Sequence, residues 1–337
     1  MSASAQFSWK AFLNDCKACR FTYGRNSSMN PQLYEAAYNK MKIHQTFKDN
    51  SKLQVVDMYS GPGVGAKVFN DMVQPQTHIL MEPKAAFAKI AEDHISGSGS
   101  IKLYRKEPYL WESFISLTNE DKLIAPEKQS LDHIHDSFLI MGNLTDKRGE
   151  QLYMQYLQCV ANRNWLQRFG LVKMVLWVGQ STAAKLLAPV GFRGRSRCSL
   201  ITEAVTKTKL IATSEEKASK LFHSDVLEEN DPILIKEEKG DVALLEVTPV
   251  KHDLSLDSWD YCAQRLMITK SQPLESILEV LGHGAKEYLV PRLDPRLLSM
   301  KPICMTPEDF SIIAREFDTW PFKPTTLIDF YEVVDSH

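Results

Sequence analysis

A glycine-rich turn at residues 60–65 is the first segment whose residue types and spacing suggest ligand binding. Gly61 and Gly63 follow an apolar run and allow the backbone to approach a ligand closely, with amide groups turned toward it. Glu82 ends the next apolar run, 21 residues after Gly61, where a carboxylate can accept both ribose hydroxyls of a nucleoside. Two alternatives stay open: the glycines serve only the turn, and Glu82 caps a helix.

Arginines alternate with small residues at 191–197, a pattern suited to a polyanion. Arg193, Arg195 and Arg197 offer guanidinium groups that bind phosphate oxygens, while the small residues leave the backbone free to follow a phosphate chain. The alternative is an ordinary solvated surface. We predict that all three arginines contact nucleic acid.

A second basic group surrounds an aromatic residue. Arg163 and Arg168 flank Trp165, and Lys185 follows further along the chain. We include Arg163, Arg168 and Lys185 among the predicted nucleic-acid contacts, whereas Trp165 is explained as well by a place in the core.

Two aromatic rings follow the third apolar run, separated by one residue. Tyr109 and Trp111 can project the same way if this segment is extended, and each ring can stack on an unpaired base. The alternative is that both rings cover the edge of a sheet.

The net charge of −2 hides an uneven distribution. Residues 145–210 hold eleven Lys and Arg against three acids, a balance of +8, whereas residues 256–337 hold eight against thirteen, a balance of −5. One region therefore suits a polyanion and the other does not. A composition of 44% hydrophobic and 24% charged residues excludes disorder, collagen and coiled coil.

The six cysteines predict no metal site and no disulfide framework. Cys16 and Cys19 have a C-x-x-C spacing, but no second pair completes a zinc site, so independent reduced thiols are the better interpretation. No apolar run is long enough to cross a bilayer, and we expect no membrane partner. The first residues only weakly resemble a mitochondrial address, which leaves the location open.

These residues need a scaffold that brings distant segments together, and the apolar runs supply one. Short β-rich runs alternate with helical stretches, which predicts an α/β fold with a mostly parallel sheet and helices on both faces. Three later runs predict an added antiparallel edge. From residue 256 apolar residues recur at helical spacing, so we predict an α/β domain over 1–255 and a helical domain over 256–337. The eight strand-like runs are 53–59, 78–82, 101–105, 138–144, 172–178, 208–213, 231–235 and 243–247.

Several motifs together give the chain a family resemblance over nearly its whole length. They are D-M-Y-S-G-P-G at 57–63, Glu82, R-K-E-P-Y-L-W at 105–111, G-N-L-T at 142–145, the stretch 195–212, W-D-Y at 259–261, L-G-H-G at 281–284 and W-P-F-K-P at 320–324. The sequence resembles the ribosomal RNA adenine dimethyltransferase family. Within it, the chain is most similar to a fungal branch that serves the mitochondrial RNA polymerase. The resemblance implies a class I methyltransferase-like, Rossmann-like fold with a small all-helical C-terminal domain.

The departures from the enzymes fall in the cofactor pocket. Tyr59 stands where the family's loop has its first glycine, Glu107 replaces an aspartate, and a Gln-Asn-Phe-Leu segment corresponds to residues 25–28, of which only Asn26 is kept. The resemblance therefore implies a vestigial S-adenosylmethionine pocket and no required cofactor. Its predicted remnant residues are Asn26, Ser28, Gly61, Gly63, Glu82, Glu107 and Asn143.

The family's catalytic motif is Asn, an apolar residue, Pro and an aromatic residue that stacks on a flipped adenine. Here the run is Asn143-Leu144-Thr145-Asp146, without the proline and the ring, and the carboxylate of Asp146 would repel a phosphate. We expect no methyl transfer and no catalytic residue. Asn143 has the alternative role of capping the turn after its strand.

The resemblance implies a promoter-specificity and melting factor of a single-subunit mitochondrial RNA polymerase. Such a factor would form a heterodimer with the polymerase, bind the non-template strand of promoter DNA, and act in the mitochondrial matrix at the nucleoid. Two alternatives stay open: an active S-adenosylmethionine-dependent dimethyltransferase, and a structural ribosome-assembly factor that keeps only the RNA surface.

Overall fold

The protein is described from a computed structural model that covers the chain except residues 1–6, 20–23, 48, 97–98, 237–239 and 325–337. Within the described residues the chain forms two compact units. The first comprises the chain up to Ala184 together with Thr206–Lys251. The second comprises Lys185–Val205 together with the chain from His252 onward.

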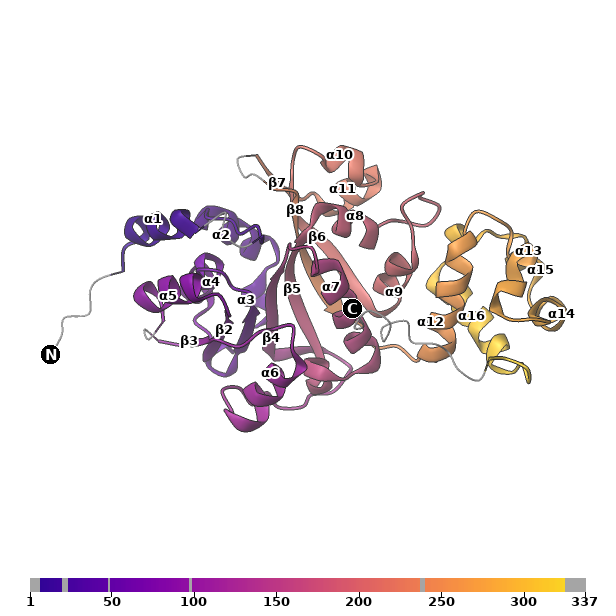
Figure 1. The fold of residues 1–337 in the computed structure, drawn as a ribbon, viewed down its shortest axis with the longest axis horizontal. Helices are drawn as coiled ribbons and strands as arrows, with labels where there is room; N and C mark the ends of the chain where they lie inside the picture. Colours follow the sequence, from indigo (N-terminus) through magenta and orange to yellow (C-terminus); the bar gives the residue numbers. More distant parts are fainter. Residues whose placement is uncertain (1–6, 20–23, 48, 97–98, 237–239, 325–337) are drawn as a thin grey trace, which may run out of the picture. The chain divides into compact units, whose positions relative to one another are not determined.

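The first unit is built on a sheet with strand order β3-β2-β1-β4-β5-β8-β6-β7 in the described part of the chain (Figure 1). Each strand coincides with one of the predicted runs, and the mostly parallel sheet is confirmed. The strands are β1 Gln54–Met58, β2 Thr77–Met81, β3 Ile101–Tyr104, β4 Ile134–Leu144, β5 Leu171–Gly179, β6 Thr206–Ser214, β7 Ile233–Ile235 and β8 Val242–Pro249.

The last three strands form one end of the sheet and pair antiparallel through β8, so the predicted antiparallel edge is confirmed except at β7. Only β8 is reversed, and it lies between β5 and β6, while the edge strand β7 is parallel to β6. The reason lies in the sequence of β8, whose first six residues are all buried. A strand that is apolar on both faces is stable only inside a sheet whose two faces are covered.

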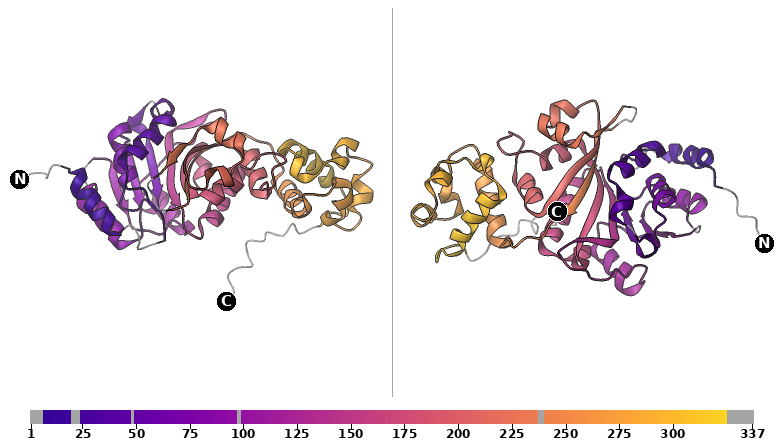
Figure 2. Two further views of the ribbon diagram at one scale, coloured as in Figure 1. Left: turned by 90° about the horizontal axis from the view of Figure 1, so that it is seen from above. Right: turned by 180° about the vertical axis from the view of Figure 1, so that it is seen from behind.

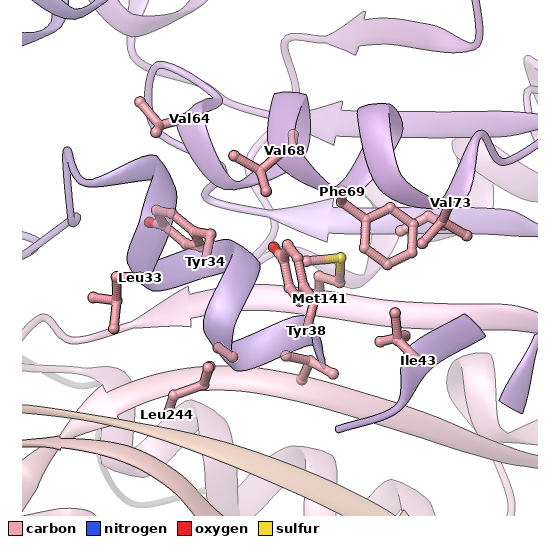
Figure 3. Close-up of a cluster of buried hydrophobic side chains, with 14 of the residues drawn as sticks. Leu33, Tyr34, Tyr38, Ile43, Val64, Val68, Phe69, Val73, Met141 and Leu244 are labelled. Atoms are coloured by element: carbon pink, nitrogen blue, oxygen red, sulfur yellow. The ribbon is translucent and has the colours of Figure 1, made fainter. Parts of the chain in front are cut away.

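Helices cover both faces of this sheet (Figures 1 and 2). On one face, α2 and α4 pack together, with Tyr38 beside Phe69 (Figure 3). The same cluster of buried side chains includes Val55 of β1. On the other face, Tyr156 of α7 reaches Met58 of the same strand, since side chains three residues apart in a strand point to opposite sides. The helices are α1 Trp9–Cys19, α2 Pro31–Lys40, α3 Ile43–Thr46, α4 Val64–Val73, α5 Ala85–His94, α6 Trp111–Ile115, α7 Gly149–Asn162, α8 Gln180–Leu186, α10 Ala218–Leu221 and α11 Ser224–Asn230.

The second unit is helical, as the three- and four-residue spacing predicted. Trp259 on α12 packs beside Phe310 on α16, and Thr306 and Asp309 form a capping box at the start of α16. Its helices are α9 Arg197–Val205, α12 Leu256–Leu266, α13 Leu274–Ile277, α14 Ala285–Leu289, α15 Pro295–Ser299 and α16 Pro307–Asp318.

The boundary between the units needs one correction. We predicted a single division after residue 255, but Lys185–Val205 belongs with the helices. Arg195 donates to the carbonyl of Met305, and Arg197 forms a bidentate pair with Asp260, so α9 and the loop before it are bonded within the helical unit. No helix in the described ranges is both long and apolar enough to cross a bilayer.

Candidate functional site

Four segments meet at the carboxyl ends of the parallel strands. Three of them follow β1, β3 and β4, and the fourth is the loop at residues 25–28. Hydrogen bonds with the side chains of Asn143 and Thr145 hold that loop in place. This edge of an open α/β sheet is where such folds place their ligands. We call it the loop edge.

Tyr59 and Arg25 fill part of the loop edge. The Tyr59 hydroxyl donates to Glu107 Oε1, and the Arg25 guanidinium lies 3.5 Å above the Tyr59 ring. Arg25 Nη2 in turn lies 2.5 Å from Asp146 Oδ2. Burial and the Glu107 contact raise the pKa of Tyr59 far above its ordinary value. The four side chains form a continuous strut across the segments, which we call the Tyr59 strut.

The backbone at Tyr59 explains why this position suits glycine. Its φ is +54°, in the left-handed region, which costs a non-glycine residue about 1 kcal/mol or more. The side-chain contacts of the strut hold the residue there. Gly63 has a φ of +90°, and a Cβ on it would come within 2.5 Å of Ile95 Cδ1, so this glycine serves the packing of the turn.

Both the nitrogen and the oxygen of the Asn143 side-chain amide have hydrogen-bond partners within the protein. Its Nδ2 donates to the Asn26 carbonyl and to Ser27 Oγ, each at 3.0 Å, while its Oδ1 accepts from the amide and the hydroxyl of Thr145. The side chain thus bonds the turn after β4 to the loop at 25–28. This is the arrangement of the capping alternative.

Glu82 is 2% exposed and also has protein partners on both oxygens. Oε2 accepts from the Gly61 amide at 2.9 Å, and Oε1 accepts from the Lys84 amide at 2.8 Å. Burial nevertheless raises the pKa of Glu82 to about 7. The glycine amide that we expected to face a ligand is bonded to the carboxylate that we expected to bind ribose.

The pKa of Glu82 predicts an unusual pH dependence of stability. Because the folded-state pKa lies above the ordinary glutamate value of 4.5, the folded state holds a proton that the unfolded state releases as pH rises from about 4.5 to 7. The free energy of unfolding should therefore fall over this window by roughly 3 kcal/mol through Glu82 alone.

The test is urea unfolding of the wild type and of Glu82→Gln at pH 5 and at pH 8. The variant cannot titrate at this position, so its stability relative to the wild type should rise between the two pH values. An equal pH dependence in both proteins would contradict the raised pKa.

The space left at the loop edge is small. One cavity, of about 30 Å³, is lined by Ser27, Tyr59 and Asn143 together with residues of α2, α4, β4 and β5. Pockets for drug-sized ligands have about 300 Å³ or more. Ser28, which we predicted to line this pocket, instead accepts from the Asn30 amide, and its neighbour Ser27 takes the place at the cavity.

The segment after β3 carries an exposed aromatic surface. Trp111 is 41% exposed and contacts the edge of Trp165, whose ring stacks on Tyr156 at 4.5 Å. Tyr109 is half-buried, and the guanidinium of Arg148 lies 5.6 Å above its ring. Of the two predicted rings, Trp111 is thus the more open. Arg148 was missed in the sequence; its signal is a Lys-Arg pair directly after Asp146.

Of the predicted cations near this surface, Arg168 is exposed and donates to Thr118 in the segment after α6. Arg163 ends α7 with a φ of +53°, is exposed, and lies two residues before Trp165. The Trp165 ring is partly buried in the aromatic cluster, which agrees with its core interpretation. Trp111, Arg168 and Trp165 are therefore brought together around α6.

The arginine loop needs a second correction. Arg195 is 1% exposed and donates to the carbonyls of Ala188 and Met305, with Glu203 as its ion-pair partner. It cannot reach a phosphate, since its guanidinium is inside the helical unit. The alternation of arginines with small residues at 191–197 therefore indicates a tight loop and not a phosphate-binding loop.

The other predicted cations of the helical unit differ in exposure. Arg197 is committed to Asp260, Lys185 is half-buried, and Arg193 is exposed. In the first unit Lys173 pairs with Glu246 inside the sheet. The balance of +8 thus overstates the charge offered to a polyanion, because Lys173 and Arg197 have acidic partners outside the region.

No set of three or more His, Cys, Asp or Glu side chains is placed to hold a metal ion in the described part of the chain. Cys16 is buried in α1, while the Cys19 side chain lies outside the described residues.

A family model described as ribosomal RNA adenine dimethylase matches residues 16–302. The chain belongs to the ribosomal RNA adenine dimethylase family. It is 39% identical over 328 residues to Mitochondrial transcription factor 1 of Lachancea kluyveri, covering 95% of this chain and 96% of the relative. The protein of the same name from Saccharomyces cerevisiae is also 39% identical over the same coverage.

Among solved structures, a dimethyladenosine transferase from Plasmodium falciparum has the same fold. The TM-score is 0.56 at 15% identity, covering 86% of this chain and 96% of that one. The methyltransferase-like fold is thereby confirmed. At the loop edge the Tyr59 strut occupies part of the space between the segments, and the cavity lined by Tyr59 and Asn143 has a volume of about 30 Å³.

Proposed function

We propose that this chain is a mitochondrial transcription initiation factor. It gives a single-subunit mitochondrial RNA polymerase its promoter specificity and stabilises the melted promoter by binding the non-template strand, without methyl transfer. It acts as a heterodimer with the polymerase in the mitochondrial matrix, at the nucleoid. The relatives are named as mitochondrial transcription factors, which supports a role in transcription in the mitochondrion.

One observation carries the molecular part of the proposal. At the loop edge Tyr59, Arg25 and Asp146 bond to one another across the segments, while Trp111 and nearby cations stay exposed. A surface of this kind can stack unpaired bases and hold their phosphates. Opening a promoter loses on the order of 1.4 kcal/mol of stacking per base step, and each base captured on a ring returns about 1 to 3 kcal/mol.

Runoff transcription by the cognate polymerase tests the function. The chain should stimulate transcription from a duplex promoter and have little effect when the same promoter is pre-melted around the start site. Equal activity on both templates would reject a melting role. No stimulation on either template would favour the ribosome-assembly alternative.

We also propose that the chain needs no cofactor. Calorimetric titration with S-adenosylmethionine at millimolar concentration should give no saturable heat, because the Tyr59 strut occupies the space and Glu82 and Asn143 already have partners. An active dimethyltransferase serves as the positive control. Saturable binding together with methylated adenines in small-subunit ribosomal RNA would establish the enzyme instead.

A further inference from the structure

A second, larger cavity lies away from the loop edge, where α1, α2 and α4 meet. Its volume is about 430 Å³, within the range of sites that bind ligands or anchor side chains. The walls are mainly apolar: Trp9 and Leu13 come from α1, and Val68 and Met72 from α4. We call it the three-helix groove.

The charged residues of the groove are mostly acidic. Glu35 from α2 and Asp71 from α4 belong to its lining, and both are exposed. Lys67, a basic residue of α4, pairs with Asp71. The Lys67 ammonium also lies 4.5 Å from the centre of the Phe7 ring. Asp71 is thus partly neutralised, whereas Glu35 faces the groove without a bonded cation in the described part of the chain.

This combination selects one kind of occupant. An acidic rim repels the phosphates of nucleic acids and of anionic lipid surfaces. Apolar walls between helices fit the apolar face of another helix, whose anchors recur every three or four residues. A cation on that helix would meet Glu35 as its apolar side chains enter the groove.

We propose that the three-helix groove is a docking site for a basic amphipathic helix of a partner protein. The apolar face of that helix packs against Trp9, Leu13 and Met72, and a Lys or Arg near the end of the contact pairs with Glu35. The site is separate from the loop edge and does not depend on the function proposed for it.

The probe is a 14-residue amphipathic helical peptide of Leu and Lys, and the comparison peptide has Glu in place of every Lys. Binding to the full chain is followed by the methyl resonances of its methionines, with the Met72 signal assigned through Met72→Leu. The Lys peptide should shift the Met72 methyl resonance in a saturable way and leave Met174, which is buried in β5, unchanged.

Charge reversal at the rim gives the decisive comparison. Glu35→Lys should weaken binding of the Lys peptide by about fivefold or more, since a favourable pair is replaced by repulsion. The matched control, Glu228→Lys, changes an exposed acid on α11 and should leave the affinity unchanged. The proposal is overturned if Met72 does not shift, if the Glu peptide binds as tightly, or if both charge reversals act alike.

Discussion

Replacing Trp111 with alanine should strongly reduce promoter opening by this chain and its polymerase. The indole is 41% exposed at the loop edge, so the substitution removes an open stacking face. Loss of one stacked base costs about 1 to 3 kcal/mol, which corresponds to roughly 5- to 150-fold in the equilibrium for opening. Tyr109→Ala should have a smaller effect, because Arg148 already covers its ring.

The measurement is 2-aminopurine fluorescence at non-template positions of the bubble. Trp111→Phe keeps a ring and should retain most of the opening, whereas a pre-melted promoter should restore activity to Trp111→Ala. Unchanged fluorescence in the Tyr109 and Trp111 double variant would remove these rings from the proposal. A far-UV spectrum of each variant is needed, since Trp111 also contacts Trp165.

Arg195→Ala should destabilise the helical unit by about 2 to 4 kcal/mol, while Arg193→Ala should stay within about 0.5 kcal/mol of the wild type. The loss of Arg195 leaves the carbonyls of Ala188 and Met305 without their donor inside the unit. Its pair with Glu203 adds little, because that carboxylate is 43% exposed.

Hydrogen exchange of the α9 and α16 amides reports on this unit alone. Faster exchange in Arg195→Ala, with DNA affinity changed no more than stability requires, fits the buried role. For Arg193→Ala the expected change is a salt dependence of DNA binding that is lower by about one phosphate contact. Normal exchange combined with a lower salt dependence in Arg195→Ala would instead restore the phosphate-contact interpretation.

The sequence predicted the helices and strands well, because hydrophobic periodicity and composition depend on residues that are close together in the chain. Each apolar run became a strand, and the helical spacing after residue 256 became helices. It failed where partners lie far apart in sequence. The position of β8 inside the sheet depends on what covers its two faces. α9 joins the helical unit through the bond from Arg197 to Asp260, and the loop before it through the bond from Arg195 to Met305.

The candidate site was predicted in its location but only partly in its contacts. Gly61, Glu82, Glu107 and Asn143 do lie at one edge of the sheet, as strand-end residues must. The role of Arg25 could not be predicted, because its pairing with Asp146 spans 121 residues. The role of Arg195 could not be predicted from its residue type either, because a guanidinium binds backbone carbonyls as readily as phosphates.

The division of the chain into units has a consequence for truncation. The polypeptide passes from the first unit to the second after Ala184, returns at Thr206 and leaves again after Lys251. A stop codon after residue 255 would therefore not delete one unit and spare the other, because α9 and the loop before it would remain while their partners Asp260 and Met305 were lost. Removal of the C-terminal helices as one terminal segment would therefore leave part of the same unit behind.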